Sequence, residues 1–176
     1  MRLYVARHGQ TLWNAQNKVC GITDVDLTEK GQKQAEALAT VVAGKDIDLI
    51  LSSPLRRAVA TSEIISGKCR IPMKIERRLI EQNYGIYEGV DRADKAFLDN
   101  KRNFAYKYPG GESQIQVAYR IYSLIDELKM EYNDKNILLI SHGGVCRVIN
   151  TYFRDMTNEE FFQYRLENGK LEEYEL

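Results

Sequence analysis

The chain has 176 residues, 44% of them hydrophobic, and its 25 basic and 25 acidic side chains give a formal net charge of zero. This length suits one folded unit, so we expect a single domain over residues 1–176. The balanced charge excludes a global field that would draw the molecule to nucleic acid or to an anionic membrane, and we expect neither partner.

The sequence also lacks the features of a membrane-spanning or secreted protein. No apolar run approaches the roughly 20 residues that a membrane-spanning helix needs, and the N-terminal stretch is too poor in apolar residues for a secretory signal. Cys20, Cys69 and Cys146 show no metal-type spacing and are odd in number. We therefore expect a cytoplasmic protein with reduced thiols, and the sequence leaves its oligomeric state open.

Short apolar runs rich in branched residues predict β-strands along the chain. They lie at Leu3–Ala6, Ile47–Leu51, Met73–Ile75 and Ile137–Ile140, and the closing LEEYEL predicts an edge strand. The continuous apolar character of DLILSS and NILLIS is typical of parallel strands that are covered on both faces. With helical segments between most of the strands, the sequence predicts an α/β protein, a three-layer α/β/α sandwich with a mostly parallel central sheet.

The predicted helices begin at residues that are typical of helix N-termini. These starts are Thr28, Ser53, Ser113, the neighbourhood of Gly144, and Thr157 in the capping-box sequence TNEE. In SSPLRR we expect Ser53 to cap its helix and Pro54 to take the first helical position, where its missing N–H costs nothing. This places Arg57 in the first turn, with Val59 on the buried stripe.

The stretch from Arg92 to Tyr108 interleaves basic and aromatic side chains. Such a segment can flank or cover a pocket. An ordinary solvated helix with its aromatic side chains turned inward explains the pattern equally well. Both interpretations stay open at the level of sequence.

The only two histidines, His8 and His142, each follow a strand-like run and precede a glycine, in YVARHG and LLISHGG. Ligands of open α/β sheets bind beyond the carboxyl ends of the strands, so neighbouring strands would bring both imidazoles to one rim. A glycine at that rim lets the backbone approach a ligand closely. The pair therefore predicts a shared site.

Three roles fit histidines at such positions. A single histidine at a strand end is most often a core or capping residue. A metal site is disfavoured because neither His8 nor His142 has a nearby Cys or His partner in the sequence and because Arg7 adjoins His8. An anion fits better, since Arg7 offers a guanidinium fork that matches phosphate and the helix after Gly143 offers free N–H groups. Arg57 could reach the same rim.

Six blocks of the sequence occur in the order of one protein family: RHGQTLWN, GITDVDLTEKGQKQA, SSPLRRAVAT, RLIEQNYGIYEG, PGGES and SHGG. The chain resembles the histidine phosphatase superfamily, the phosphoglycerate mutase-like group, over nearly its whole length. A lone Arg-His-Gly would be a weak signal, but six ordered blocks are specific. The resemblance implies a phosphoglycerate mutase-like fold.

The resemblance also implies the roles of the catalytic residues. His8 would be the nucleophile that forms a phosphohistidine. Glu81 would donate a proton to the leaving alkoxide and then deprotonate the attacking water. The groups that would hold the phosphoryl oxygens are Arg7, Arg57, His142 and the backbone N–H of Gly143. No metal and no cofactor is implied.

Four further residues match family positions that contact substrate: Asn14, Cys20, Gly21 and Tyr84. Asn14 would donate an amide hydrogen bond, and Cys20 and Gly21 would approach the substrate through backbone groups. For Tyr84 a packing role is an equal alternative. Tyr87 departs from the tryptophan that the family often has there, which makes specificity less transferable but does not touch the chemistry.

The compact size of the chain favours hydrolysis over phosphoryl transfer between metabolites. Only residues 82–109 separate Glu81 from GGES, whereas mutases of this superfamily carry a long insertion there. We therefore expect a metal-independent phosphatase acting on a small phosphorylated metabolite, with residues 82–109 as a short lid. Three alternatives remain: a phosphoglycerate mutase-type reaction, a non-catalytic module that binds a phospho-ligand or a protein, and a phosphatase that acts on a phosphoprotein.

Overall fold

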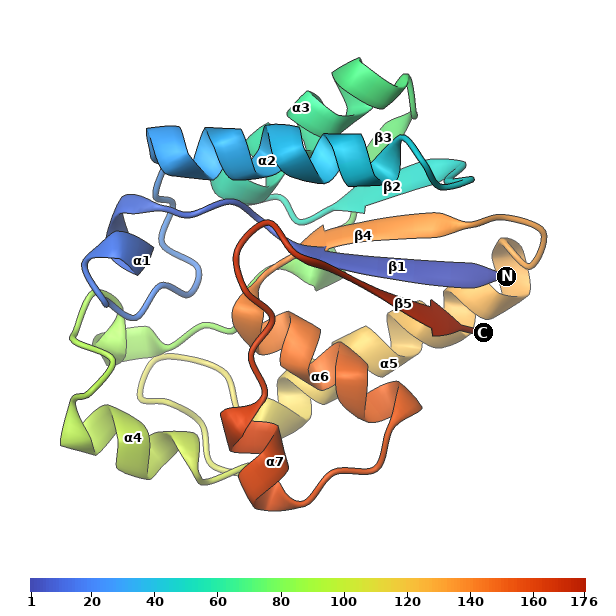
Figure 1. The fold of residues 1–176 in the computed structure, drawn as a ribbon. Coiled ribbons are helices and arrows are strands. Elements are labelled where there is room, and N and C mark those ends of the chain that lie inside the picture. Colours follow the sequence, from blue (N-terminus) through green and yellow to red (C-terminus); the bar gives the residue numbers. More distant parts are fainter.

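A five-stranded sheet lies at the centre of the molecule, which a computed structural model describes over residues 1–176 (Figure 1). The strands are β1 (Arg2–Arg7), β2 (Leu49–Ser52), β3 (Met73–Ile75), β4 (Ile137–Ser141) and β5 (Leu171–Glu175), in the order β3-β2-β4-β1-β5. The first four strands run parallel, and β5 pairs antiparallel with β1 at the edge. The five predicted strands are confirmed. β2 begins two residues later than expected because Ile47 still belongs to the preceding turn, where its N–H donates to the Lys45 carbonyl.

Helices cover both faces of the sheet, which confirms the three-layer α/β/α architecture (Figure 1). The four long ones are α2 (Glu29–Val42), α3 (Arg56–Cys69), α5 (Gln114–Glu131) and α6 (Gly143–Phe153). Alternate residues of β1 point into different cores. Leu3 and Val5 pack with α5 and α6, whereas Tyr4 and Ala6 pack with α2 and α3. The continuous apolar runs of the central strands therefore reflect burial on both faces.

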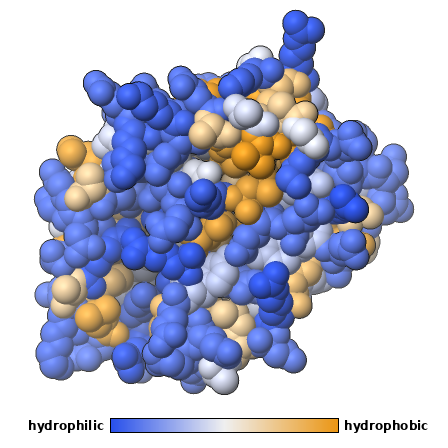
Figure 2. All heavy atoms as spheres, viewed as in Figure 1, coloured by the Kyte–Doolittle hydropathy of each residue, from blue (hydrophilic) through white to orange (hydrophobic).

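Three short helices complete the helical content: α1 (Leu12–Ala15), α4 (Lys95–Lys101) and α7 (Asn158–Gln163). The predicted caps of α2, α5 and α7 are confirmed, because Thr28, Ser113 and Thr157 each accept a backbone N–H of the first turn. None of the helices combines the length and the apolar character that crossing a bilayer would require. The face drawn in Figure 2 is mainly hydrophilic, with hydrophobic atoms gathered in a band near its centre.

The predicted start of α3 is wrong. The N-cap is Leu55, which makes no side-chain cap, and Pro54 lies before the helix. Ser53 lies two residues before the N-cap, and its hydroxyl accepts the N–H of Leu55 at 3.4 Å and lies 2.7 Å from Nε2 of His142. Val59 is only partly buried, and the inward face of α3 includes Arg57. A polar site thus occupies part of the face that the sequence predicted to be apolar.

Residues 82–109 fold as a segment beyond the carboxyl edge of the sheet, with a 3-10 turn at Gly85–Tyr87 followed by α4 (Figure 1). Tyr84, Phe97 and Tyr108 form a small aromatic core of this segment together with Val19. The Tyr84 ring meets those of Phe97 and Tyr108 edge-on, at centroid distances of 5.6 and 5.2 Å. Aromatic packing therefore anchors the segment against the loop that carries Val19.

Candidate active site

The two histidines lie next to each other at the carboxyl ends of β1 and β4. Arg7 and Ser141 are paired at the ends of these strands, so His8 and His142 follow at the same level. The backbone N–H of His8 donates to the Ser141 carbonyl at 3.1 Å, and the two ring centroids are 4.9 Å apart. The sheet therefore brings the imidazoles together as the parallel strand order predicts.

His8 is a buried, neutral imidazole whose proton lies on Nδ1. Its Nδ1 is 2.6 Å from the Gly9 carbonyl oxygen, which can only accept a hydrogen bond. Burial, followed by the charges of Arg57 and Arg7, lowers the pKa of His8 well below its ordinary value. Nε2 consequently keeps its lone pair, which is the state a histidine nucleophile requires.

Arg57 lies between the two imidazoles and is almost fully buried. Its Nε is 3.3 Å from Nε2 of His8 and 3.1 Å from Nδ1 of His142. Its two terminal nitrogens donate to the carbonyls of Thr23 and Gly21, at 2.8 and 2.6 Å. The loop around Gly21 therefore fixes the orientation of the guanidinium beneath the site.

His142 is also neutral, with the opposite tautomer. Because its Nδ1 accepts from Arg57, the proton lies on Nε2, which donates to the Ser53 hydroxyl. Burial, Arg57 and the neighbouring His8 lower the pKa of His142 well below its usual range. His142 and Arg57 lie below the cavity surface, whereas His8 reaches it.

Arg7 has an unused donor in a buried position. It is 4% exposed, and its Nη1 donates to the Leu166 carbonyl at 2.9 Å. Its Nε has no hydrogen-bond partner although it is buried. Burial and the charge of Arg92 lower the Arg7 pKa to about 10, so the side chain remains cationic at neutral pH. Buried donors are rarely left unpaired, and an anion beside His8 would satisfy this one.

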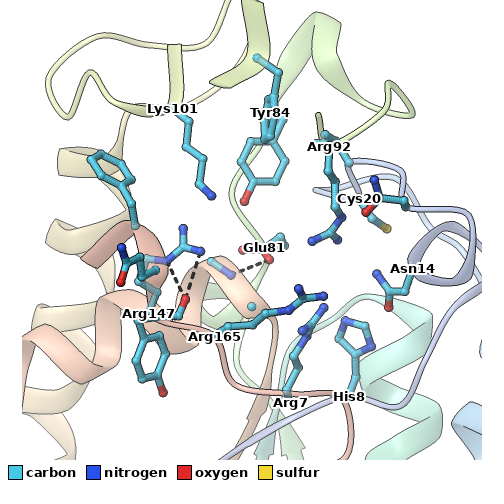
Figure 3. Close-up of a pocket in the computed structure, with 18 residues that line it drawn as sticks. Arg7, His8, Asn14, Cys20, Glu81, Tyr84, Arg92, Lys101, Arg147 and Arg165 are labelled. Atoms are coloured by element: carbon cyan, nitrogen blue, oxygen red, sulfur yellow. Dashed lines mark hydrogen bonds between the residues drawn. The ribbon is translucent and has the colours of Figure 1, made fainter. Parts of the chain in front are cut away.

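Glu81 faces His8 across the cavity from the segment that follows the turn Arg77–Leu79 (Figure 3). One carboxylate oxygen accepts the N–H of Gln82 at 2.9 Å, and the other accepts the N–H of Gly144 at 3.0 Å. The first turn of α6 thus holds the carboxylate in place. A β-carbon at Gly144 would lie 2.6 Å from Glu81 Oε1, so glycine is needed for this approach.

The four expected substrate contacts are placed in different ways. Asn14, Cys20 and Tyr84 line the cavity. Gly21 lies beneath it, and both its backbone groups are used by the protein, its N–H by Glu88 and its carbonyl by Arg57. Burial and Glu81 raise the pKa of Tyr84, so its phenol stays protonated.

Sequence reasoning assigned no site role to four basic residues that line the cavity. Arg92 and Lys101 lie in the segment for which the sequence left two interpretations open, and both side chains line the cavity. Arg147 could have been found, because it lies one helical turn after Gly143 and therefore on the same face of α6. Arg165 comes from an irregular loop and carries no sequence signal.

The cavity has a volume of about 310 Å³, the size of a small-molecule site. Five basic side chains and one acidic side chain line the cavity (Figure 3). The basic residues are Arg7, Arg92, Lys101, Arg147 and Arg165, and the acidic residue is Glu81. No three His, Cys, Asp or Glu residues are grouped so as to hold a metal ion. A neutral imidazole among guanidinium groups, at the carboxyl rim of a mostly parallel sheet, defines the class of site as one for an anionic, phosphate-like ligand.

Comparison with known proteins identifies the family. The profile of the Histidine phosphatase superfamily (branch 1) matches residues 3–176. A glucosyl-3-phosphoglycerate phosphatase of Mycolicibacterium vanbaalenii is 34% identical, over 84% of this chain and 72% of that relative. A 2,3-bisphosphoglycerate-dependent phosphoglycerate mutase of Cytophaga hutchinsonii is 29% identical, over 98% and 86%.

Solved structures agree with this relationship. A mycobacterial glucosyl-3-phosphoglycerate phosphatase complexed with VO3 superposes with a TM-score of 0.87 at 28% identity, covering 98% of this chain and 91% of that one. The α-ribazole phosphatase of Shigella flexneri gives 0.85 at 27% identity, covering 98% and 89%. The chain belongs to the histidine phosphatase superfamily. It is an enzyme of the phosphatase class with a phosphoglycerate mutase-like fold.

Proposed function

We propose that the protein hydrolyses a small phosphomonoester through a phosphohistidine on His8, without a metal ion. The observation that carries the proposal is the contact of His8 Nδ1 with the Gly9 carbonyl oxygen, at 2.6 Å. The His8 proton is fixed on Nδ1 by this carbonyl, and Nε2 keeps a lone pair next to two buried guanidinium groups. That arrangement suits in-line attack on a phosphoryl group whose negative charge the guanidinium groups balance.

In the first step, Nε2 of His8 forms a bond to phosphorus while the bond from phosphorus to the ester oxygen breaks. Glu81, which faces His8 across the cavity and enters this step as the protonated acid, transfers its proton to the departing oxygen (Figure 3). Arg7 and the backbone N–H of Gly143 bind the phosphoryl oxygens, and Arg57 and His142 act from below the cavity surface, where Arg57 supplies positive charge and His142 Nδ1 accepts the hydrogen bond of Arg57 Nε. Arg7 contributes its unpartnered Nε.

In the second step, water attacks the phosphohistidine. Glu81, now a carboxylate, takes a proton from that water, the bond between phosphorus and Nε2 breaks, and inorganic phosphate leaves. His8 returns to its starting tautomer because the Gly9 carbonyl still holds the Nδ1 proton. The same two side chains therefore serve both half-reactions.

The remaining expected contacts take supporting roles in this proposal. Asn14 binds the substrate through its amide, since its Oδ1 already accepts from Thr11 and Asn168. Cys20 and Tyr84 contact the organic part of the substrate. Gly21 acts indirectly, by holding Arg57 through its carbonyl. The three free cysteines support a cytoplasmic location.

A test of the proposal is phosphate release from p-nitrophenyl phosphate in the presence of EDTA, with wild type and His8→Ala compared. We expect wild type to turn over with the chelator present and His8→Ala to fall to background. Near-ultraviolet circular dichroism would show that the variant is folded. Wild type that binds phosphate but does not exceed the His8→Ala rate would establish a binding module instead.

A mutase is the second candidate function, because a relative with that name matches 98% of the chain. The short segment of residues 82–109 favours hydrolysis, since a mutase has to keep its phosphohistidine away from water. Incubation with 3-phosphoglycerate and 2,3-bisphosphoglycerate distinguishes the two. Release of phosphate without formation of 2-phosphoglycerate supports the phosphatase, and efficient interconversion supports the mutase.

A further inference from the structure

The wall of the cavity that faces away from His8 carries a positive charge that the reacting phosphoryl group does not use. A phosphate ester carries a charge of about −1.5 to −2 at neutral pH, and Arg7 and Arg57 lie next to His8 to meet it. Arg92 and Arg165 lie on the same side of Glu81 as Arg7 and His8, and Lys101 and Arg147 line the cavity in addition (Figure 3). The only carboxylate there, Glu81, is engaged with two backbone N–H groups.

Lys101 is the clearest case of a cation without a counter-ion. Lys95, on the same helix, pairs with Asp99 at 2.6 Å, whereas Lys101 forms no ion pair and points its amine into the cavity (Figure 3). The acidic residues of this segment are used elsewhere, for example Asp94 as the cap of α4. Burial and the nearby charges of arginines, led by Arg147, lower the pKa of Lys101 to about 8.

Arg147 points to the same part of the cavity from the opposite element, α6 (Figure 3). Its Nε and Nη2 both donate to the Tyr164 carbonyl, at 3.4 and 3.3 Å, and its guanidinium lies 5.4 Å from the centre of the Phe161 ring. These contacts fix the orientation of the side chain and leave Nη1 for a ligand. Arg165 is more exposed and is already paired with Glu167 at 3.3 Å.

Lys101 and Arg147 lie on the side of Glu81 that is away from His8 (Figure 3). Because Glu81 protonates the leaving oxygen in the proposed mechanism, these two side chains would face the organic part of the substrate. We infer that the physiological substrate is a small phosphomonoester whose organic part bears a second anionic group, bound by Lys101 and Arg147. This inference rests on the proposed function, and it covers both a carboxylate and a second phosphate.

The test uses pairs of substrates that differ in the second anion. The carboxylate pair is 3-phosphoglycerate and glycerol 3-phosphate, which share a three-carbon skeleton. The phosphate pair is fructose 1,6-bisphosphate and fructose 6-phosphate. For at least one pair we expect kcat/KM to be about tenfold or more higher for the member with the second anion, as one charge-assisted hydrogen bond provides. The pair that shows the preference identifies the group.

Variants connect this preference to the two side chains. Lys101→Gln and Arg147→Gln should each lower the ratio of kcat/KM within the preferred pair by about fivefold or more. Lys101→Met serves as a second variant that keeps the length of the side chain, and Lys95→Gln, on the same helix, is the matched control that should leave the ratio unchanged. Raising NaCl from 50 to 500 mM should lower the wild-type ratio as well.

Failure of this inference is distinguishable from failure of the proposed function. If wild type does not hydrolyse p-nitrophenyl phosphate above His8→Ala, the proposed function is wrong. If wild type hydrolyses p-nitrophenyl phosphate but neither substrate pair shows a preference, the inference of a second anionic group on the substrate is wrong. The inference is also wrong if Lys101→Gln, Lys101→Met and Arg147→Gln keep the wild-type ratio of kcat/KM within the preferred substrate pair.

Discussion

The proton on His8 illustrates how single atoms determine what this site can do. Nδ1 faces a carbonyl that only accepts, and Nε2 faces Arg57, which only donates. Both contacts favour the neutral ring with an unprotonated Nε2, whose lone pair accepts from Arg57. His142 uses the same guanidinium nitrogen but the opposite tautomer, because the Ser53 hydroxyl is next to its Nε2. One arginine thus holds two imidazoles in defined protonation states.

If Glu81 donates the proton to the leaving oxygen, the loss of kcat in a Glu81 variant should depend on the leaving group. Glu81→Gln keeps the size of the side chain but cannot give up a proton, so kcat should fall by about 100-fold or more for alkyl phosphates, the lower end of the usual general-acid contribution, and much less for p-nitrophenyl phosphate. Steady-state kinetics on a series of leaving groups measures this. A uniform loss across the series would contradict the donor role.

Gly144 offers a second way to disturb the same carboxylate. In Gly144→Ala the new β-carbon would lie 2.6 Å from Glu81 Oε1 and 2.9 Å from the Tyr84 hydroxyl, so the carboxylate has to move. We expect kcat for alkyl phosphates to fall about tenfold or more, because the displaced carboxylate no longer faces the leaving oxygen.

Gly67→Ala is the matched control for that variant, because nothing lies within 4 Å of its β-carbon on α3. It should gain about 0.4–1 kcal/mol of stability with unchanged kcat. Thermal melts and kinetics on both variants test the pair. Wild-type kinetics in Gly144→Ala would show that the position of Glu81 is not critical.

Among the residues of the site, those next to regular elements could be predicted from sequence. His8, Arg7 and His142 follow strands, and Glu81 falls in an ordered motif, so pattern and chain order located them. Arg165 and Ser53 could not be predicted in their observed surroundings. Their neighbours come from distant segments, such as His142 for Ser53, and no local spacing encodes that contact.

At the level of elements, the loop that carries Glu81 is held on both sides by one side chain of α5. Arg120 donates to the Arg78 carbonyl before Glu81, and to both carboxylate oxygens of Glu112 at 3.2 Å. Glu112 in turn accepts the N–H of Asn83, after Glu81, at 3.0 Å. Arg120 is therefore a positioning residue for the loop.

Removing this connection should affect both stability and chemistry. In Arg120→Met, Glu112 loses its partner in a partly buried place, so the free energy of unfolding should fall by about 1–3 kcal/mol. A loosened loop should also lower kcat more for alkyl phosphates than for p-nitrophenyl phosphate.

Arg2→Met provides the comparison for Arg120→Met, since it removes an exposed pair with Glu173 and should leave stability nearly unchanged. Urea unfolding and leaving-group kinetics measure both variants. If Arg120→Met lost stability but kept the wild-type dependence on the leaving group, its role would be structural only.

The helices were predictable where local sequence decides their ends. Thr28, Ser113 and Thr157 cap as expected because each meets an N–H of its own first turn. Ser53 fits the same local pattern, but α3 begins later, and the Ser53 hydroxyl contacts both the Leu55 N–H and the distant His142. For the segment around α4, sequence left two interpretations, and the structure combines them. Phe97 is buried while Lys101 lines the cavity.

For the whole molecule, the polar residues of the site lie at the end of a sheet that is otherwise buried between two apolar cores. The strand order could be expected because continuous apolar runs and intervening helices leave few alternatives. The packing of residues 82–109 could not, since it depends on aromatic contacts within the segment and with Val19. Local periodicity does not encode such contacts.

Burial of two neutral histidines predicts how stability depends on pH. The pKa values of His8 and His142 are lowered in the folded state, so below about pH 6.5 only the unfolded chain takes up these two protons. The two neutral histidines therefore contribute their full stabilisation above about pH 6.5, and the free energy of unfolding decreases as the pH falls below it. The free energy of unfolding should drop by up to about 1.4 kcal/mol per pH unit for each histidine.

Urea unfolding at several pH values between 7.5 and 5.5 measures this dependence. The chain has no other histidine, and its carboxylates titrate mainly at lower pH, so the assignment is direct. A free energy of unfolding that stays constant over this range would mean that the two imidazoles are not held neutral.

The central claim is that His8 carries the phosphoryl group during turnover. Wild type mixed with p-nitrophenyl phosphate, quenched in denaturant at alkaline pH within milliseconds and analysed by peptide mass spectrometry, should contain one added phosphoryl group on the peptide of His8. His8→Ala should contain none. A phosphoryl group found on His142 or Cys20, or steady turnover with no phosphorylated peptide at any quench time, would contradict the account.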